Sequence, residues 1–264
     1  MWRLLPPLAA FLFLALLTPA APAAAKEAPA YIAIGDSLAY GVGASDPAAG
    51  GYVGLTYQGL HKSDRYNDRG LELLNLGVPG ATSSDLLLPG GQLERAIAEV
   101  RERREDTSSA DDNVEIISVD IGGNDVLALA TPDSPCLVDP LASDCQKIYG
   151  EMLVELEDNL DRVLRGLREA APQATIVVLD LYSPISGRGG GADLIADYAV
   201  GGINEVTERV ISDEELAVRL ASVAPLDRFL KELGANKMEP QPKLTVSRSS
   251  LPHETQVMLL DYRR

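Results

Sequence analysis

Residues 31–38 read YIAIGDSL, in which a short β-rich run over 31–34 predicts a strand that turns through Gly35 and Asp36 into Ser37. Further runs of this kind follow along the chain, and longer stretches with helical periodicity separate them. Alternation of short strands with helices is typical of a parallel sheet that carries helices on both faces. The sequence therefore predicts an α/β fold with a parallel sheet of roughly five strands.

The remaining strands and two of the helices can be placed from the apolar pattern. The strands after the first are predicted over residues 71–76, 114–119 and 175–181, with a weaker one over 221–225. Apolar residues recur at steps of three and four over 144–170, which predicts a helix with one stripe on the sheet. A second helix is predicted over 92–104. Its charged run at 101–106 is typical of a solvated helix end.

Three loops that follow predicted strands carry residues suited to acyl transfer. They read GDSL at 35–38, NLGVPGAT at 75–82 and IGGND at 121–125. Loops beyond the carboxyl ends of parallel strands converge on one crevice. There a serine can offer its Oγ as nucleophile, a glycine lets a backbone N–H approach closely, and an asparagine supplies a neutral amide donor. A lone serine after Gly-Asp could equally be a helix cap.

The three ordered blocks resemble those of the SGNH, or GDSL, hydrolase superfamily. This resemblance implies a flavodoxin-like three-layer α/β/α sandwich and ester hydrolysis through an acyl-enzyme, without a cofactor. It makes Ser37 the nucleophile, and it assigns the oxyanion hole to the backbone N–H groups of Ser37 and Gly80 with the side chain of Asn124. An α/β-hydrolase would instead show Gly-x-Ser-x-Gly in mid-chain. No such pentapeptide occurs.

The chain contains two histidines, so any imidazole chemistry falls to His61 or His253. The family ends with an Asp-x-x-His block, and by position His253 is the expected general base. Ser250 stands where the Asp should be. A Ser-His dyad oriented by a backbone carbonyl, or by a nearby carboxylate such as Glu254, would replace the usual triad. His61 lies in a polar context and is expected at the surface.

The charge and composition of the chain limit the classes of ligand that it is expected to bind. The 264 residues carry a net charge of -16, and no basic block is present, so nucleic acid is not an expected partner. Two histidines leave little scope for a metal site, and neither a metal nor a cofactor is predicted. We interpret Asp36, Asp120 and Asp125 as organisers of their loops, accepting local backbone N–H groups, rather than as acid and base.

The N-terminus and the cysteines indicate export. Residues 1–25 combine one Arg, an apolar stretch shorter than the ~20 residues of a spanning helix, and small residues at the end, which is typical of a secretory signal peptide. In an oxidising compartment Cys136 and Cys145 are expected to form a local disulfide, the alternative being two inert thiols. Residues 26–264 then form a single domain with an atypical tail from about 237, without a membrane span, and a monomer is favoured.

The leading hypothesis is a secreted serine esterase or lipase that acts on small-molecule or lipid esters, with Ser37 and His253 as its catalytic residues. Two alternatives remain open. The missing Asp at Ser250 is compatible with a catalytically impaired domain that uses the SGNH crevice only for binding. The same blocks would also serve a carbohydrate acetylesterase.

Overall fold

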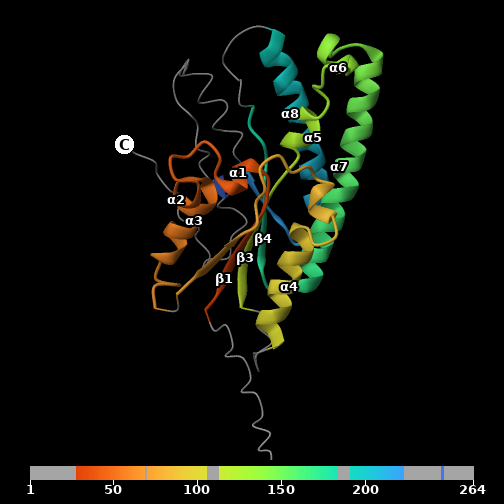
Figure 1. Ribbon diagram of the computed structural model, residues 1–264. Helices are drawn as coiled ribbons and strands as arrows, with labels where there is room; N and C mark the ends of the chain where they lie inside the picture. Colours follow the sequence, from red (N-terminus) through yellow and green to blue (C-terminus); the bar gives the residue numbers. More distant parts are fainter. Residues whose placement is uncertain (1–27, 69, 106–112, 184–190, 223–244, 247–264) are drawn as a thin grey trace, which may run out of the picture.

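The computed structural model describes residues 28–68, 70–105, 113–183, 191–222 and 245–246. Figure 1 shows three layers, with α1, α2 and α3 on one face of a central sheet and α4, α7 and α8 on the other. The predicted signal peptide, Ser250, His253 and most of the predicted tail lie outside these residues. The α/β sandwich expected from the sequence is confirmed.

Five strands form an all-parallel sheet in the order β2-β1-β3-β4-β5, and a short sixth strand pairs antiparallel with β5. Their bounds are β1 (Ala30–Gly35), β2 (Glu72–Asn75), β3 (Val114–Asp120), β4 (Thr175–Leu179), β5 (Arg219–Ser222) and β6 (Thr245–Val246). The parallel order is that of flavodoxin-like folds, in which ligands bind beyond the carboxyl ends of the strands. The sequence analysis did not predict β6.

The helices connect successive strands. They are α1 (Ser37–Tyr40), α2 (Pro47–Gly50), α3 (Tyr52–His61), α4 (Gln92–Glu105), α5 (Gly123–Leu127), α6 (Pro135–Val138), α7 (Ser143–Ala170) and α8 (Gly191–Ile211), with a 3₁₀ turn, η1, at Asp85–Leu87. The predicted helices over 92–104 and 144–170 are confirmed as α4 and α7. Within the described part of the chain, no helix is long and apolar enough to cross a membrane.

The core lies on both faces of the sheet because successive side chains of a strand point to opposite sides. Ile32 and Ile34 of β1 pack in the core beneath α4, α7 and α8, whereas Tyr31 and Ala33 pack toward α1 and α3. All six residues of β1 are buried. Burial on both faces explains why the strand reads as a nearly continuous apolar run.

The charged run at the end of α4 differs from its prediction at one residue. Arg101, Glu102 and Arg104 are exposed, but the side chain of Arg103 is only 2% exposed. Its guanidinium donates to Glu99 at 2.8 Å, to Glu72 at 2.6 Å and to the carbonyl of Ala28 at 2.9 Å. The prediction that Arg103 is solvated is wrong. Two of its partners, Glu72 and Ala28, lie far from it in the sequence and approach it only in the folded chain.

Candidate active site

Ser37 is the first residue of α1 and directly follows the turn at the carboxyl end of β1. Asp36 caps this helix, and its Oδ1 accepts a hydrogen bond from the N–H of Leu38 at 2.9 Å. Gly35 has φ +149°, and a Cβ there would lie 2.2 Å from the carbonyl oxygen of Asp120. Only glycine fits this turn, which leaves Ser37 partly exposed at the edge of the sheet.

A buried glutamine fixes the backbone of this turn. Gln92, at the start of α4, accepts from the N–H of Gly35 at 2.7 Å and donates to the carbonyl of the same residue at 2.8 Å. No sequence pattern predicts this role for Gln92. Its partner lies 57 residues away, so no local pattern could have revealed the contact.

The second loop packs against the first helix. Asn75 donates its side-chain amide to the carbonyl of Ala39 at 2.7 Å, and the N–H of Val78 donates to Gly35 at 3.1 Å. Gly80 lies beyond these contacts with φ +84° and is exposed. Its N–H and that of Ser37 have no acceptor among the described residues, so both donors are available to a ligand.

The third loop joins the other two through Asn124, which lies in α5. Its Nδ2 donates to Oδ2 of Asp36 at 3.2 Å and to the carbonyl of Ala81 at 2.9 Å. The residue before Ser37 and the residue after Gly80 therefore share one amide group. Both hydrogens of that amide have acceptors within the protein. Asn124 can therefore donate to an oxyanion only if it shares or gives up one of these bonds. The bond to Asp36 is the longer of the two and is the one we expect to be exchanged.

Among the described residues, Asp125 accepts hydrogen bonds from the second loop, 42 residues away, and not from the local N–H groups predicted for it. Its buried carboxylate accepts the N–H of Ser83 at 3.0 and 3.1 Å and the hydroxyl of Ser83 at 2.5 Å. Asn159 of α7 donates to the same hydroxyl at 3.0 Å. Ser83 and Asn159 therefore support the site without having been recognised in the sequence.

Asp36, the residue before Ser37, and Asp120 both have buried carboxyl groups, and the N–H of Asp36 donates to the carbonyl of Asp120 at 3.2 Å. Burial raises the pKa of Asp36 to about 6, although the hydrogen bond from Leu38 lowers it. Burial and the charge of Asp36 raise the pKa of Asp120 well above its usual range. The backbone N–H of Ala39 acts in the opposite direction and lowers the pKa of Asp120. The role of Asp120 as an acceptor of a backbone N–H therefore stays a prediction.

The histidines do not meet the three loops within the described part of the chain. His61 ends α3, is exposed, and lies with its ring centroid 5.5 Å from that of Tyr57. His253 is outside the described residues, so its role as general base stays a prediction.

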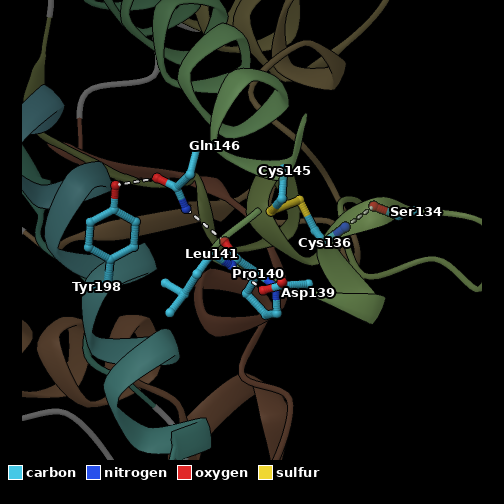
Figure 2. The surroundings of a disulfide bond; sticks show 8 residues. All are labelled: Ser134, Cys136, Asp139, Pro140, Leu141, Cys145, Gln146 and Tyr198. Carbon is cyan, nitrogen blue, oxygen red and sulfur yellow. Dashed lines mark hydrogen bonds between the residues drawn. A yellow bond between two sulfur atoms is a disulfide. The ribbon is translucent and has the colours of Figure 1, made fainter. Parts of the chain in front are cut away.

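The predicted pairing of Cys136 with Cys145 is confirmed, with a Cα–Cα distance of 4.7 Å (Figure 2). The described residues contain no group of three or more His, Cys, Asp or Glu side chains placed to hold a metal ion.

The parallel sheet, covered by helices on both faces, and the three loops at its carboxyl edge are those of the SGNH hydrolase fold. The model of the GDSL-like Lipase/Acylhydrolase family matches residues 33–236, and the chain belongs to this family. A search among curated proteins finds no significant match.

Three solved structures with similar folds are distant in sequence. An extracellular lipase from Streptomyces rimosus is 23% identical over 75% of this chain and 81% of its own, with a TM-score of 0.52. Phospholipase A1 from Streptomyces albidoflavus NA297 is 20% identical over 80% of this chain and 86% of its own, with a TM-score of 0.52. A catalytic mutant of an acetylxylan esterase from Geobacillus stearothermophilus is 18% identical over 82% of this chain and 83% of its own, with a TM-score of 0.53.

Proposed function

We propose that this protein is a secreted serine hydrolase that cleaves carboxylic esters through an acyl-enzyme on Ser37. Membership of the GDSL-like family supports ester hydrolysis. The observation that carries the proposal is the amide of Asn124, which bridges Asp36 and Ala81. This bridge gathers the serine turn, the glycine loop and the asparagine loop around one point at the edge of the sheet.

In the first half of the proposed reaction, Ser37 Oγ attacks the ester carbonyl carbon while His253 accepts the hydroxyl proton. The carbonyl oxygen becomes an oxyanion and accepts from the N–H groups of Ser37 and Gly80 and from Asn124 Nδ2. Collapse of the tetrahedral intermediate breaks the ester C–O bond, and the leaving alcohol takes the proton from His253. Water then cleaves the acyl-serine by the same steps, releasing the acid and restoring the Ser37 hydroxyl.

The position of Ser37 supports this chemistry. It is the first residue of α1, and its backbone N–H has no acceptor among the described residues, so this donor can face developing negative charge. Gln92 and Asp36 hold the turn rigidly. Donors fixed before the reaction need no reorganisation when charge develops, which is the main source of oxyanion stabilisation.

Export is part of the proposal. The features that support it are the signal-like residues 1–25, the disulfide between Cys136 and Cys145, and the likeness in fold to a lipase described as extracellular. Residues 26–264 would then be the mature single domain.

The proposal is tested by substitution of Ser37. Ser37→Ala should lose hydrolysis of a short-chain aryl ester and labelling by a fluorophosphonate probe. Ser45→Ala, which changes an exposed serine, should keep both. Retained hydrolysis in Ser37→Ala would refute the mechanism, and absence of labelling in the wild-type protein would favour the impaired binding domain.

Two further measurements define the base and the substrate. His253→Ala should lower turnover by several orders of magnitude, and an unchanged rate would remove the C-terminal tail from the mechanism. A profile over acyl-chain lengths and acetylated sugars separates a lipase or esterase from the alternative carbohydrate acetylesterase.

A further inference from the structure

The loop closed by the disulfide, residues 136–145, exposes large apolar side chains. Val138 is 83% exposed, Leu141 75% and Leu137 56%. Isolated apolar residues at a surface are normal, but a cluster of them marks an interaction site. We call this segment the disulfide loop.

The disulfide loop is held in shape by contacts that do not involve its apolar side chains. Besides the disulfide, Gln146 donates to the carbonyl of Pro140 at 2.7 Å and accepts from the hydroxyl of Tyr198 at 2.9 Å. Figure 2 shows these bonds linking the loop to α7 and α8. The N–H of Leu141 also donates to Asp139 at 3.0 Å. With its backbone fixed in this way, the loop does not fold back to bury Leu137, Val138 and Leu141.

The disulfide loop lies at the catalytic end of the molecule. The chain passes from α5, which contains Asn124, into the disulfide loop, which includes most of α6 and the first residues of α7. In Figure 1, α6 and the start of α7 lie beyond the carboxyl end of the sheet, the same end at which α1 and α5 begin. Leu127, at the end of α5, is 66% exposed. Apolar surface is therefore present at both ends of this connection.

The charges around the disulfide loop disfavour an anionic lipid surface. Residues 127–145 contain no Lys or Arg, and their charged residues are Asp133, Asp139 and Asp144. Binding to anionic membranes relies on Lys and Arg beside the apolar side chains. Because this segment is acidic and the whole chain carries a net charge of -16, an anionic surface would repel it. An uncharged or zwitterionic lipid surface would not.

We propose that the disulfide loop inserts Leu137, Val138 and Leu141 into a neutral lipid surface and holds the active site against esters in that surface. Binding of the disulfide loop to lipid does not depend on the proposed hydrolase function. The further statement that the substrates are esters held in a lipid surface rests on that function. Each aliphatic side chain moved from water into lipid contributes roughly a tenfold factor to partitioning. Three such side chains form a useful anchor without a membrane-spanning helix.

The test measures binding of the oxidised, full-length protein to phosphatidylcholine vesicles by co-sedimentation. Ser37→Ala serves as the parent, so that lipid turnover does not alter the vesicles. The triple variant Leu137→Ser/Val138→Ser/Leu141→Ser should bind at least about tenfold more weakly. Val154→Ser is the matched control, because Val154 is 69% exposed on α7, and it should bind like the parent. Addition of phosphatidylglycerol should weaken binding.

Several results would overturn the proposal. These are failure of the parent to bind phosphatidylcholine, binding that requires anionic lipid, and equal binding by the triple variant. Sedimentation that shows a dimer of the parent and a monomer of the triple variant would assign the apolar loop to a second copy instead. Unchanged melting temperature and absence of free thiols establish that the triple variant folds.

Kinetics with Ser37 intact separate the docking surface from the proposed function. The triple variant should hydrolyse a soluble monomeric ester at the wild-type rate and lose at least about tenfold on an emulsified one. Vesicle binding without cleavage of any ester would refute the hydrolase function and leave the docking surface standing. Cleavage of both esters at wild-type rates by the triple variant would refute the docking surface alone.

Discussion

The side-chain amide of Asn124 lies 3.2 Å from the carboxylate of Asp36, a residue 88 positions earlier in the chain. The same amide lies 2.9 Å from the carbonyl of Ala81. One side chain thus fixes the spacing between the turn that carries Ser37 and the loop that carries Gly80. Loss of this side chain should disturb chemistry more than folding.

We therefore expect Asn124→Ala to lower kcat by about 10²–10³, the usual effect of removing one oxyanion donor, with a much smaller change in KM. Steady-state kinetics on a soluble aryl ester measure this. Asn67→Ala, at an exposed position, is the control and should leave kcat unchanged. A wild-type kcat in Asn124→Ala would remove the amide from the mechanism.

The two hydrogen bonds between the Gln92 side chain and the backbone of Gly35 predict that Gln92→Ala is less stable than the wild type. The substitution leaves the buried N–H of Gly35 without its acceptor and should cost about 1–3 kcal/mol in the free energy of unfolding. Urea unfolding measures the change. Gln173→Ala, at an exposed residue, should stay within about 0.5 kcal/mol of wild type, and equal stability of the two variants would contradict the role given to Gln92.

Gly35 and Gly43 both have positive φ, but only at Gly35 would an added Cβ also clash with a neighbouring atom. In Gly35→Ala the new Cβ would meet the carbonyl of Asp120, so we expect a loss above about 4 kcal/mol or no folded protein. In Gly43→Ala, at φ +94° with open space around the Cβ, the cost should be about 1–2 kcal/mol. Thermal melting of both variants checks this order, and the reverse order would contradict it.

The buried pair Asp36 and Asp120 should make the protein less stable as pH rises. The raised pKa values mean that between about pH 4 and pH 6 the folded chain holds protons that the unfolded chain has released. The free energy of unfolding therefore falls over this window. The contribution of Asp36 is fully present below about pH 4 and is lost as pH rises through about 6.

Asp120→Asn removes one of the two protons while keeping the shape of the side chain. The slope of unfolding free energy against pH should become shallower, by up to about 1.4 kcal/mol per pH unit. Urea unfolding from pH 4 to pH 7 measures it, with the exposed Asp64→Asn as control. An unaltered slope in Asp120→Asn would show that this carboxyl does not retain its proton.

The disulfide should stabilise the protein through the short loop that it closes. Cys136→Ser/Cys145→Ser is expected to lose about 2–3 kcal/mol of unfolding free energy, as chain entropy predicts for a loop of this length. Dithiothreitol should lower the melting temperature of the wild type and leave that of the variant unchanged. A similar response of both proteins to the reductant would show that the bond adds no stability.

Much of the scaffold could be predicted from the sequence because its signals are local. The apolar runs of β1 and β3 and the periodic stripe of α7 are present within single segments, and the structure has each within a residue or two of its predicted bounds. The blocks around Ser37, Gly80 and Asn124 could be predicted to meet, because parallel strands bring the loops at their carboxyl ends to one edge.

Other features depend on partners that lie far along the chain. Arg103 was expected in solvent and is buried, because Glu72 and Ala28 approach it only after β1 and β2 have paired beside α4.

The sequence by itself determined the order of strands and helices, the turn at Gly35 and the set of chemical groups, because these follow from periodicity and from residue type. Only the tertiary structure decided that Gln92 clamps Gly35 and that Asn124 joins Asp36 to Ala81. Such contacts join side chains tens of residues apart, and their geometry exists only once the sheet and α4 have packed.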